Sequence, residues 1–122
     1  MENLINWFET PAVDFKRAVS FYKSILDLDI KEAEMFGAKM GFFPTDGKNV
    51  SGAIVQGKDH KPSSDGVIVY LNAGNNLQTI LDKVETNNGK VIVPRTQIIP
   101  EMGYIGMFID TEGNKMAVHS IR

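Results

Sequence analysis

The positions of apolar and polar residues predict one β-strand, one helix and three further strands in the first half of the chain. Residues Leu4–Thr10 alternate in the manner of a strand, which Pro11 ends. Apolar residues then recur every three or four positions, which predicts an amphipathic helix over Asp14–Asp27 with Asp14 as its N-cap. The three further strands are predicted at Asp29–Phe36, Lys39–Phe43 and Ser51–Gln56. The first half therefore reads as βαβββ.

The second half repeats this order. Val67–Ala73 predicts a strand, and a second helix is expected over Asn76–Asn88, where Asn88 and Gly89 supply the left-handed end. The last three strands are predicted at Val91–Val93, Tyr104–Ile109 and Lys115–Ile121. Gly113 and Asn114 can adopt the positive φ that a hairpin turn needs. The helix stripe Phe15, Val19 and Tyr22 matches Leu77, Leu81 and Val84 at a constant offset of about half the chain.

These two repeats, about 1–57 and 66–122, are expected to form one domain over residues 1–122, because a βαβββ module buries only one face and needs a partner. The polar segment Gly57–Gly66 joins them as a connector or as a mobile flap. A length of 122 residues suits one core and leaves little for a second domain.

Composition narrows the possible functions. The chain has no cysteine, which excludes disulfides and thiolate chemistry, and no apolar run approaches the roughly 18 residues of a membrane span. Residues Met1–Thr10 lack the basic start and the apolar stretch of a signal peptide, so the cytoplasm is the expected compartment. The net charge of −2 favours no nucleic-acid partner, and Lys58, His60 and Lys61 read as a small basic patch in a solvated loop.

Three sequence motifs carry a resemblance to a known family. They are Trp7-Phe8-Glu9-Thr10-Pro11, Asp14 with Arg17-Ala18 and Phe21-Tyr22, and Asp110-Thr111-Glu112-Gly113-Asn114. In order and spacing they resemble the vicinal oxygen chelate superfamily of glyoxalase I, bleomycin-resistance proteins and extradiol dioxygenases. The resemblance covers essentially the whole chain. It implies an α+β fold in which tandem βαβββ modules form curved mixed sheets around a cleft for a small molecule, and it implies a homodimer.

The resemblance also implies where a divalent cation would bind. Many relatives hold one with His, Glu or Gln side chains from the first and last strands of the modules. The matching positions here are Trp7, Ile68 (or Val69 with a shift of one residue) and Ala117. None of these side chains is a metal donor, so we expect no metal and no other cofactor.

Polar side chains nevertheless fall near the same cleft. Strand alternation places Trp7 and Glu9 on one face, then Ile68, Tyr70 and Asn72, and then Ala117 and His119. These seven residues are the predicted ligand-binding residues, with Trp7 as a stacking wall. Glu9 and His119 are the candidate catalytic residues. Burial among apolar neighbours would suit Glu9 as a general base or as the partner of a cationic ligand, whereas a solvated or lysine-paired carboxylate would be structural.

Other side chains have simpler interpretations. His60 can descend over a ligand or remain an exposed loop histidine, and Glu112 reads as a solvated charge in a turn. Met102, Tyr104 and Met107 suit an adaptable apolar wall, core filling or a dimer seam.

Two functions follow from these expectations. The first is a glyoxalase/bleomycin-resistance-like protein that binds a small molecule without the family metal site. The alternative is a lyase, isomerase or dioxygenase-type enzyme of the same superfamily, with a metal site relocated to Glu9 and His119 or with metal-free acid–base chemistry.

Overall fold

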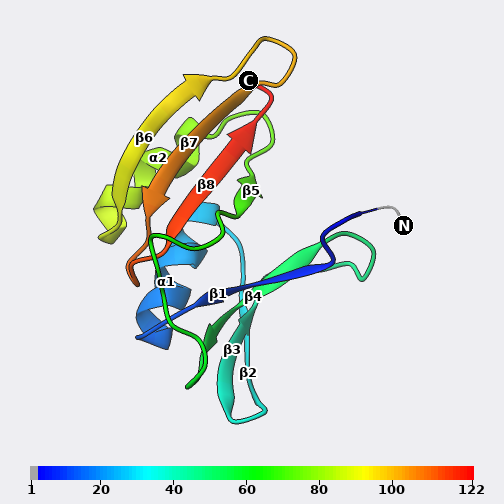
Figure 1. The fold of residues 1–122 in the computed structure, drawn as a ribbon, viewed down its shortest axis with the longest axis vertical. Helices are drawn as coiled ribbons and strands as arrows, with labels where there is room; N and C mark the ends of the chain where they lie inside the picture. Colours follow the sequence, from blue (N-terminus) through cyan, green and yellow to red (C-terminus); the bar gives the residue numbers. More distant parts are fainter. Residues whose placement is uncertain (1–2) are drawn as a thin grey trace.

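The computed structural model describes residues 3–122 and contains two four-stranded mixed sheets with the same strand order (Figure 1). The first sheet has the order β1-β4-β3-β2 and consists of β1 (Trp7–Pro11), β2 (Lys31–Met35), β3 (Ala38–Phe42) and β4 (Ser51–Gln56). The second has the order β5-β8-β7-β6 and consists of β5 (Tyr70–Asn72), β6 (Lys90–Gln97), β7 (Tyr104–Ile109) and β8 (Lys115–Ser120). The outer pairs β1–β4 and β5–β8 are parallel, and the other pairs are antiparallel. The predicted α+β fold of tandem βαβββ modules is confirmed.

The first helix forms as its sequence predicts. α1 (Phe15–Leu26) begins after Asp14, whose side chain accepts a hydrogen bond from the Arg17 amide at 3.2 Å. It ends at Asp27, which takes a left-handed conformation with φ of 51°.

The second helix is shorter than predicted. α2 (Gln78–Val84) is followed by a 3-10 turn, η1 (Glu85–Asn87), and Asn88 ends the helical segment with φ of 73°. Asn76 is not the N-cap, although its Oδ1 still accepts from the Gln78 amide at 3.0 Å. The buried Leu77 instead donates its amide to Ser120 Oγ at 3.3 Å, which ties the start of the helix to the end of β8.

The observed strand boundaries differ most from the predicted ones in the second half of the chain. β5 covers only the end of the predicted Val67–Ala73 strand, and Val67 itself is exposed. β6 extends well past Val93, because register shifts between β6 and β7 interrupt the alternation that a sequence pattern detects. Gly113 takes the expected positive φ of 98°, whereas Asn114 does not.

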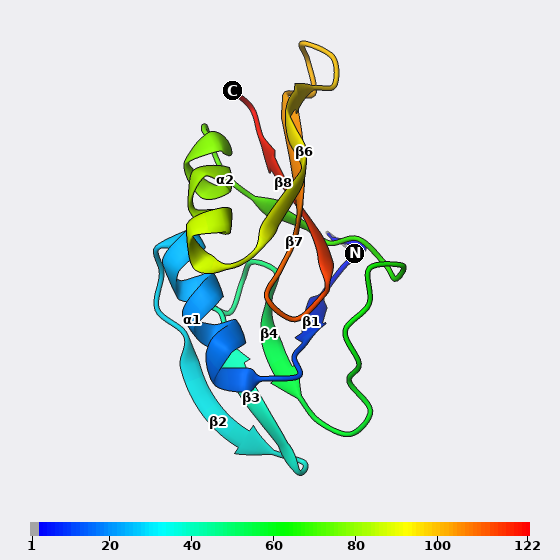
Figure 2. The same cartoon turned by 90° about the vertical axis from the view of Figure 1, so that its left-hand side faces the viewer.

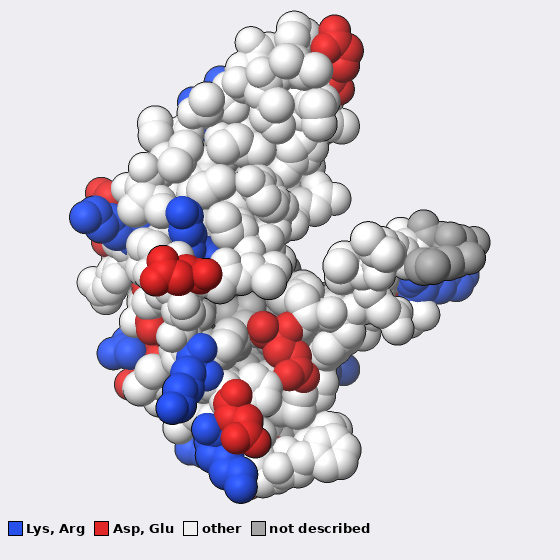
Figure 3. Space-filling model, viewed as in Figure 1, with Lys and Arg blue, Asp and Glu red and all other residues white. Residues whose placement is uncertain are grey.

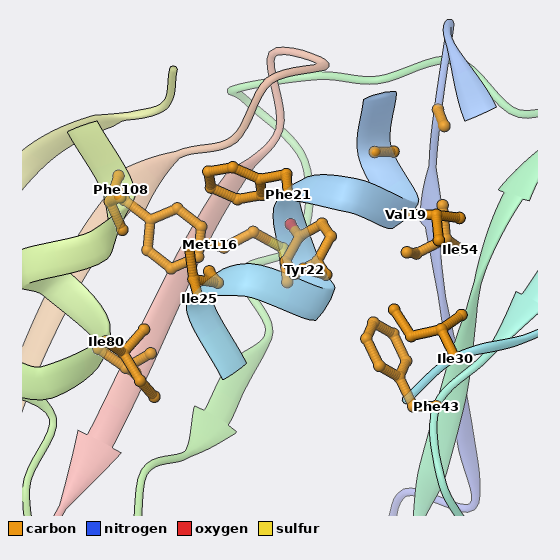
Figure 4. Packing of buried hydrophobic residues seen from close by; sticks show 14 of the residues in the cluster. Val19, Phe21, Tyr22, Ile25, Ile30, Phe43, Ile54, Ile80, Phe108 and Met116 are labelled. Carbon is orange, nitrogen blue, oxygen red and sulfur yellow. The ribbon is translucent and has the colours of Figure 1, made fainter. Parts of the chain in front are cut away.

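Both helices lie on the same side of the two sheets (Figure 2). One buried apolar cluster joins both halves of the chain, and α1 lies between its two parts (Figure 4). Phe21 meets Phe108 of the second sheet with ring centroids 5.9 Å apart, and Tyr22 meets Phe43 beyond the end of β3 at 5.8 Å. Within residues 3–122, the opposite faces of both sheets carry no helix (Figure 2). No helix among residues 3–122 is long and apolar enough to cross a membrane.

The turn between β7 and β8 fastens the second half to the start of α1. The prediction that Glu112 is a solvated charge is wrong, because Glu112 is buried. Its carboxylate accepts from the amides of Val13 and Asp14 at 2.8 and 2.6 Å, and from Arg17 Nε and Thr111 Oγ1 at 2.8 Å each. A carboxylate at the start of a helix satisfies free amides and interacts favourably with the helix dipole.

Two further side chains of this turn complete the connection. Asp110 Oδ2 accepts from the buried Tyr22 hydroxyl at 2.6 Å. Asn114 donates through Nδ2 to the Pro11 carbonyl at 2.7 Å and accepts through Oδ1 from the Ser63 amide at 3.2 Å. The turn therefore holds β1, α1 and the connector between the halves in fixed relative positions.

Candidate functional site

The helix-free face of β1 presents Trp7 and Glu9. Phe8 packs towards the core and Thr10 is buried, so alternation directs Trp7 and Glu9 to the opposite face. The Trp7 ring is 42% exposed and meets the ring of Phe42, with centroids 6.2 Å apart and planes inclined at 50°. These two rings form an aromatic wall on which a flat molecule can lie.

Glu9 pairs with His60 at the edge of this wall. The two side chains are 36% and 30% exposed, and Nε2 of His60 lies 2.8 Å from Oε1 of Glu9. Because the carboxylate accepts, Nε2 carries the proton and Nδ1 of the neutral ring is an acceptor. Glu9 is thus neither buried nor paired with a lysine. The sequence pattern did not predict this contact, because 51 positions separate the two residues in the chain.

The second group of predicted residues lies on β5 and β8. Tyr70 is in register with Ala117, and Asn72 with His119. Ala117 is fully buried, whereas the other three have accessible side chains. Tyr70, Asn72 and His119 line a hollow of about 680 Å³. The carbonyl of Met102 accepts a hydrogen bond from His119 Nε2 at 2.6 Å.

A larger groove, of about 1450 Å³, is lined by residues of both sheets and of both helices. Its walls include Trp7, Ile68, Tyr70 and Asn72, which therefore share one hollow, seen as the notch in Figure 3. The two candidate catalytic residues are not brought together: Glu9 pairs with His60 on the first sheet, and His119 lies on the second.

The side chains at the implied metal positions do not fit a divalent cation. Trp7, Ile68 and Ala117 offer no oxygen, imidazole or sulfur donor. Within the described part of the chain, no three histidine, cysteine, aspartate or glutamate side chains gather as a possible metal site. Glu9 and His60 together provide two donors, fewer than the three protein ligands of a typical catalytic zinc site.

Comparison with known proteins places this chain in a family. Residues 4–118 match the Glyoxalase/Bleomycin resistance protein/Dioxygenase superfamily, and the chain belongs to it. A search of curated proteins found no match.

Several solved structures share the fold. A glyoxalase/bleomycin resistance protein from Albidiferax ferrireducens is 14% identical with a TM-score of 0.76, and the match covers 97% of this chain and 98% of that one. TnmS3, an antibiotic binding protein from Streptomyces sp., is 18% identical with a TM-score of 0.73 and 98% coverage of both chains. Glyoxalase I from Zea mays is 10% identical with a TM-score of 0.72, and the match covers 93% of this chain but only 43% of the maize chain. At these identities the likeness establishes the fold.

Proposed function

We propose that this chain is a small-molecule-binding protein of the bleomycin-resistance type, and that it binds its ligand without the divalent cation of many relatives. The observation that supports this most is the aromatic wall of Trp7 and Phe42 beside the Glu9–His60 pair. Rings that stay accessible on a helix-free sheet face offer contact area to a ligand, and the implied metal positions carry no donors.

The chemistry of this face selects a flat molecule with a cationic group. Trp7 and Glu9 are two positions apart on one strand, so their Cα atoms are about 6.5 Å apart, within the span of a drug-sized ligand. The rings favour stacking and cation–π contact, and the carboxylate of Glu9 favours positive charge. The antibiotic binding protein TnmS3 and the fosfomycin resistance protein FosX of Listeria monocytogenes have the same fold, which is consistent with a small-molecule ligand.

We further propose that a second copy of the chain completes the cleft. Within residues 3–122, β1 hydrogen-bonds only to β4 and β5 only to β8, so the outer edges of these two strands are available for pairing. The groove beside these edges carries exposed apolar side chains, with Leu4 88%, Ile5 57% and Val67 93% exposed. Apolar surface around open strand edges is typical of a surface that a partner covers.

A matched pair of probes tests the ligand site. At neutral pH 9-aminoacridine is a flat cation and acridine is a flat neutral molecule of nearly the same size. We expect both to quench the single tryptophan, Trp7, with tighter binding of the cation. Trp7→Ala should weaken the binding of both probes by about 1–3 kcal/mol, as measured by the fluorescence of the probe. Glu9→Gln should remove the preference for the cation.

The control is Phe36→Ala, which removes a fully exposed ring from the turn between β2 and β3. It should leave both affinities unchanged. Circular dichroism must show that each variant is folded. Unchanged affinity in a folded Trp7→Ala variant would place the ligand site elsewhere.

The Glu9–His60 pair also supports a second candidate function, a metal-free acid–base enzyme. A carboxylate that holds one imidazole nitrogen orients the ring and leaves Nδ1 of His60 to accept a proton. Deuterium incorporation from D2O next to the carbonyl of small ketones would reveal such chemistry. His60→Gln should then abolish the exchange, whereas a pure binder shows none in the unmodified protein.

A further inference from the structure

A separate hollow of about 450 Å³ lies at the end of the first sheet, beneath the first residues of the connector. Its volume is within the range of about 300–1,000 Å³ that small-molecule pockets occupy. Lys39 comes from β3, whereas Lys58, His60 and Lys61 come from the connector. The lining contains no aspartate or glutamate. The lower part of Figure 3 shows lysine or arginine side chains beside aspartate or glutamate side chains at this end of the molecule.

Among residues 3–122, the three ammonium groups have no carboxylate partner. The four ion pairs formed by residues 3–122 do not include Lys39, Lys58 or Lys61. Glu34 is in register with Lys39, and Asp59 is next to Lys58 in the chain, but neither forms an ion pair with these lysines. Because the whole chain has a net charge of −2, this local excess of positive charge does not reflect a generally basic protein.

The free amide donor of Gln56 also favours an acceptor-rich ligand. Oε1 of Gln56 accepts from the Phe15 amide at 2.7 Å, so its NH2 group is the part left to donate into the hollow. His60 lines the same hollow, with its Nε2 held by the Glu9 carboxylate at 2.8 Å. A Cβ added at Gly57 would lie 3.2 Å from the side chain of Ala38 and 3.5 Å from Nδ1 of His60, so the glycine permits close packing at this wall.

We propose that this hollow binds a compact oxyanion, namely the phosphate, phosphonate or carboxylate group of a small molecule. Lysine ammonium groups are common phosphate ligands, and like charges around one hollow repel each other until an anion neutralises them. The connector turn, closed by the His60 amide donating to the Gly57 carbonyl at 3.1 Å, brings Lys58 and Lys61 to the same rim. The hollow adjoins the Trp7 wall through the Glu9–His60 pair, but the proposal does not depend on the function of that wall.

Calorimetric titration with inorganic phosphate, at constant ionic strength maintained with NaCl, tests the proposal. We expect saturable binding of one phosphate per chain. The double variant Lys58→Gln/Lys61→Gln should weaken it at least tenfold, and Lys39→Gln, on a different element, should weaken it severalfold. Lys48→Gln/Lys90→Gln removes the same charge from exposed lysines outside the hollow and should change the affinity less than twofold.

Amide NMR shifts locate the bound anion. Phosphate should shift the signals of residues 57–61 and 37–39 and leave the indole signal of Trp7 in place. Parallel titrations with phenylphosphonate and acetate separate phosphoryl-type groups from carboxylates, and saturable binding of either supports the proposal. The absence of saturable binding of all three anions by the unmodified protein, or an equal loss in the two double variants, would overturn it.

Discussion

Replacement of Glu112 by glutamine should destabilise the protein by about 2–4 kcal/mol, because hydrogen bonds to a charged group are worth about 1.5–3 kcal/mol each and neutral ones less. The side chain is only 1% exposed and accepts four hydrogen bonds, two of them from the backbone at the start of α1. Glutamine keeps one carbonyl oxygen for the amides of Val13 and Asp14. It loses the charge and presents an NH2 group to the Arg17 side chain.

Arg17→Gln is the matched control. Half of the Arg17 side chain is exposed, so its part of the ion pair is screened by water and should contribute about 1 kcal/mol or less. Urea unfolding followed by circular dichroism measures both variants. If Glu112→Gln costs no more than Arg17→Gln, the carboxylate does not stabilise the start of α1 as argued.

The same residue predicts how stability depends on pH. Burial alone raises the pKa of Glu112, but the hydrogen bonds from Arg17, the Asp14 amide, Thr111 and the Val13 amide together lower that pKa below its ordinary value of 4.5. The unfolded chain therefore takes up the proton first as the pH falls. The stabilisation is complete above about pH 5 and is lost as the pH falls through the folded-state pKa, so unfolding free energies of the unmodified protein and of Glu112→Gln should converge in acid.

Three further results are expected. Tyr22→Phe leaves Asp110 without its 2.6 Å hydroxyl donor and should lower the free energy of unfolding in urea by about 1–3 kcal/mol. Burial first, and then the Asp110 charge, raise the pKa of Tyr22, so the stabilisation by this tyrosine is present below about pH 10 and declines at higher pH. The Tyr22→Phe variant should not show this decline. Calorimetry with Ni²⁺ or Zn²⁺ should detect no sub-micromolar site, and a stoichiometric site abolished by Glu9→Gln or His119→Ala would instead revive a metal enzyme. Sedimentation at micromolar concentration should show a dimer, and a monomer alone would contradict the proposed second copy.

Local interactions explain what the sequence determined by itself. β4 and β7 have the predicted boundaries, and α1 begins after Asp14, because alternation, helical spacing and a capping side chain act over a few neighbouring residues. The bulged β6 extends beyond its prediction, since a register shift depends on the partner strand. The family motifs predicted the right fold because they mark turns and helix starts that recur in order along the chain.

The tertiary structure alone decided which polar groups meet. A pattern shows that Glu112 follows a strand, but burial of its carboxylate depends on α1, which lies far away in the sequence. In the same way, the pairing of Glu9 with His60 and the gathering of Lys39 with Lys58 and Lys61 depend on the path of the connector. Glu9 and His119 stay apart because β1 and β8 belong to different sheets. Periodicity distinguishes an inward from an outward face, whereas the partner of each side chain is set by contacts between segments that only the folded chain brings together.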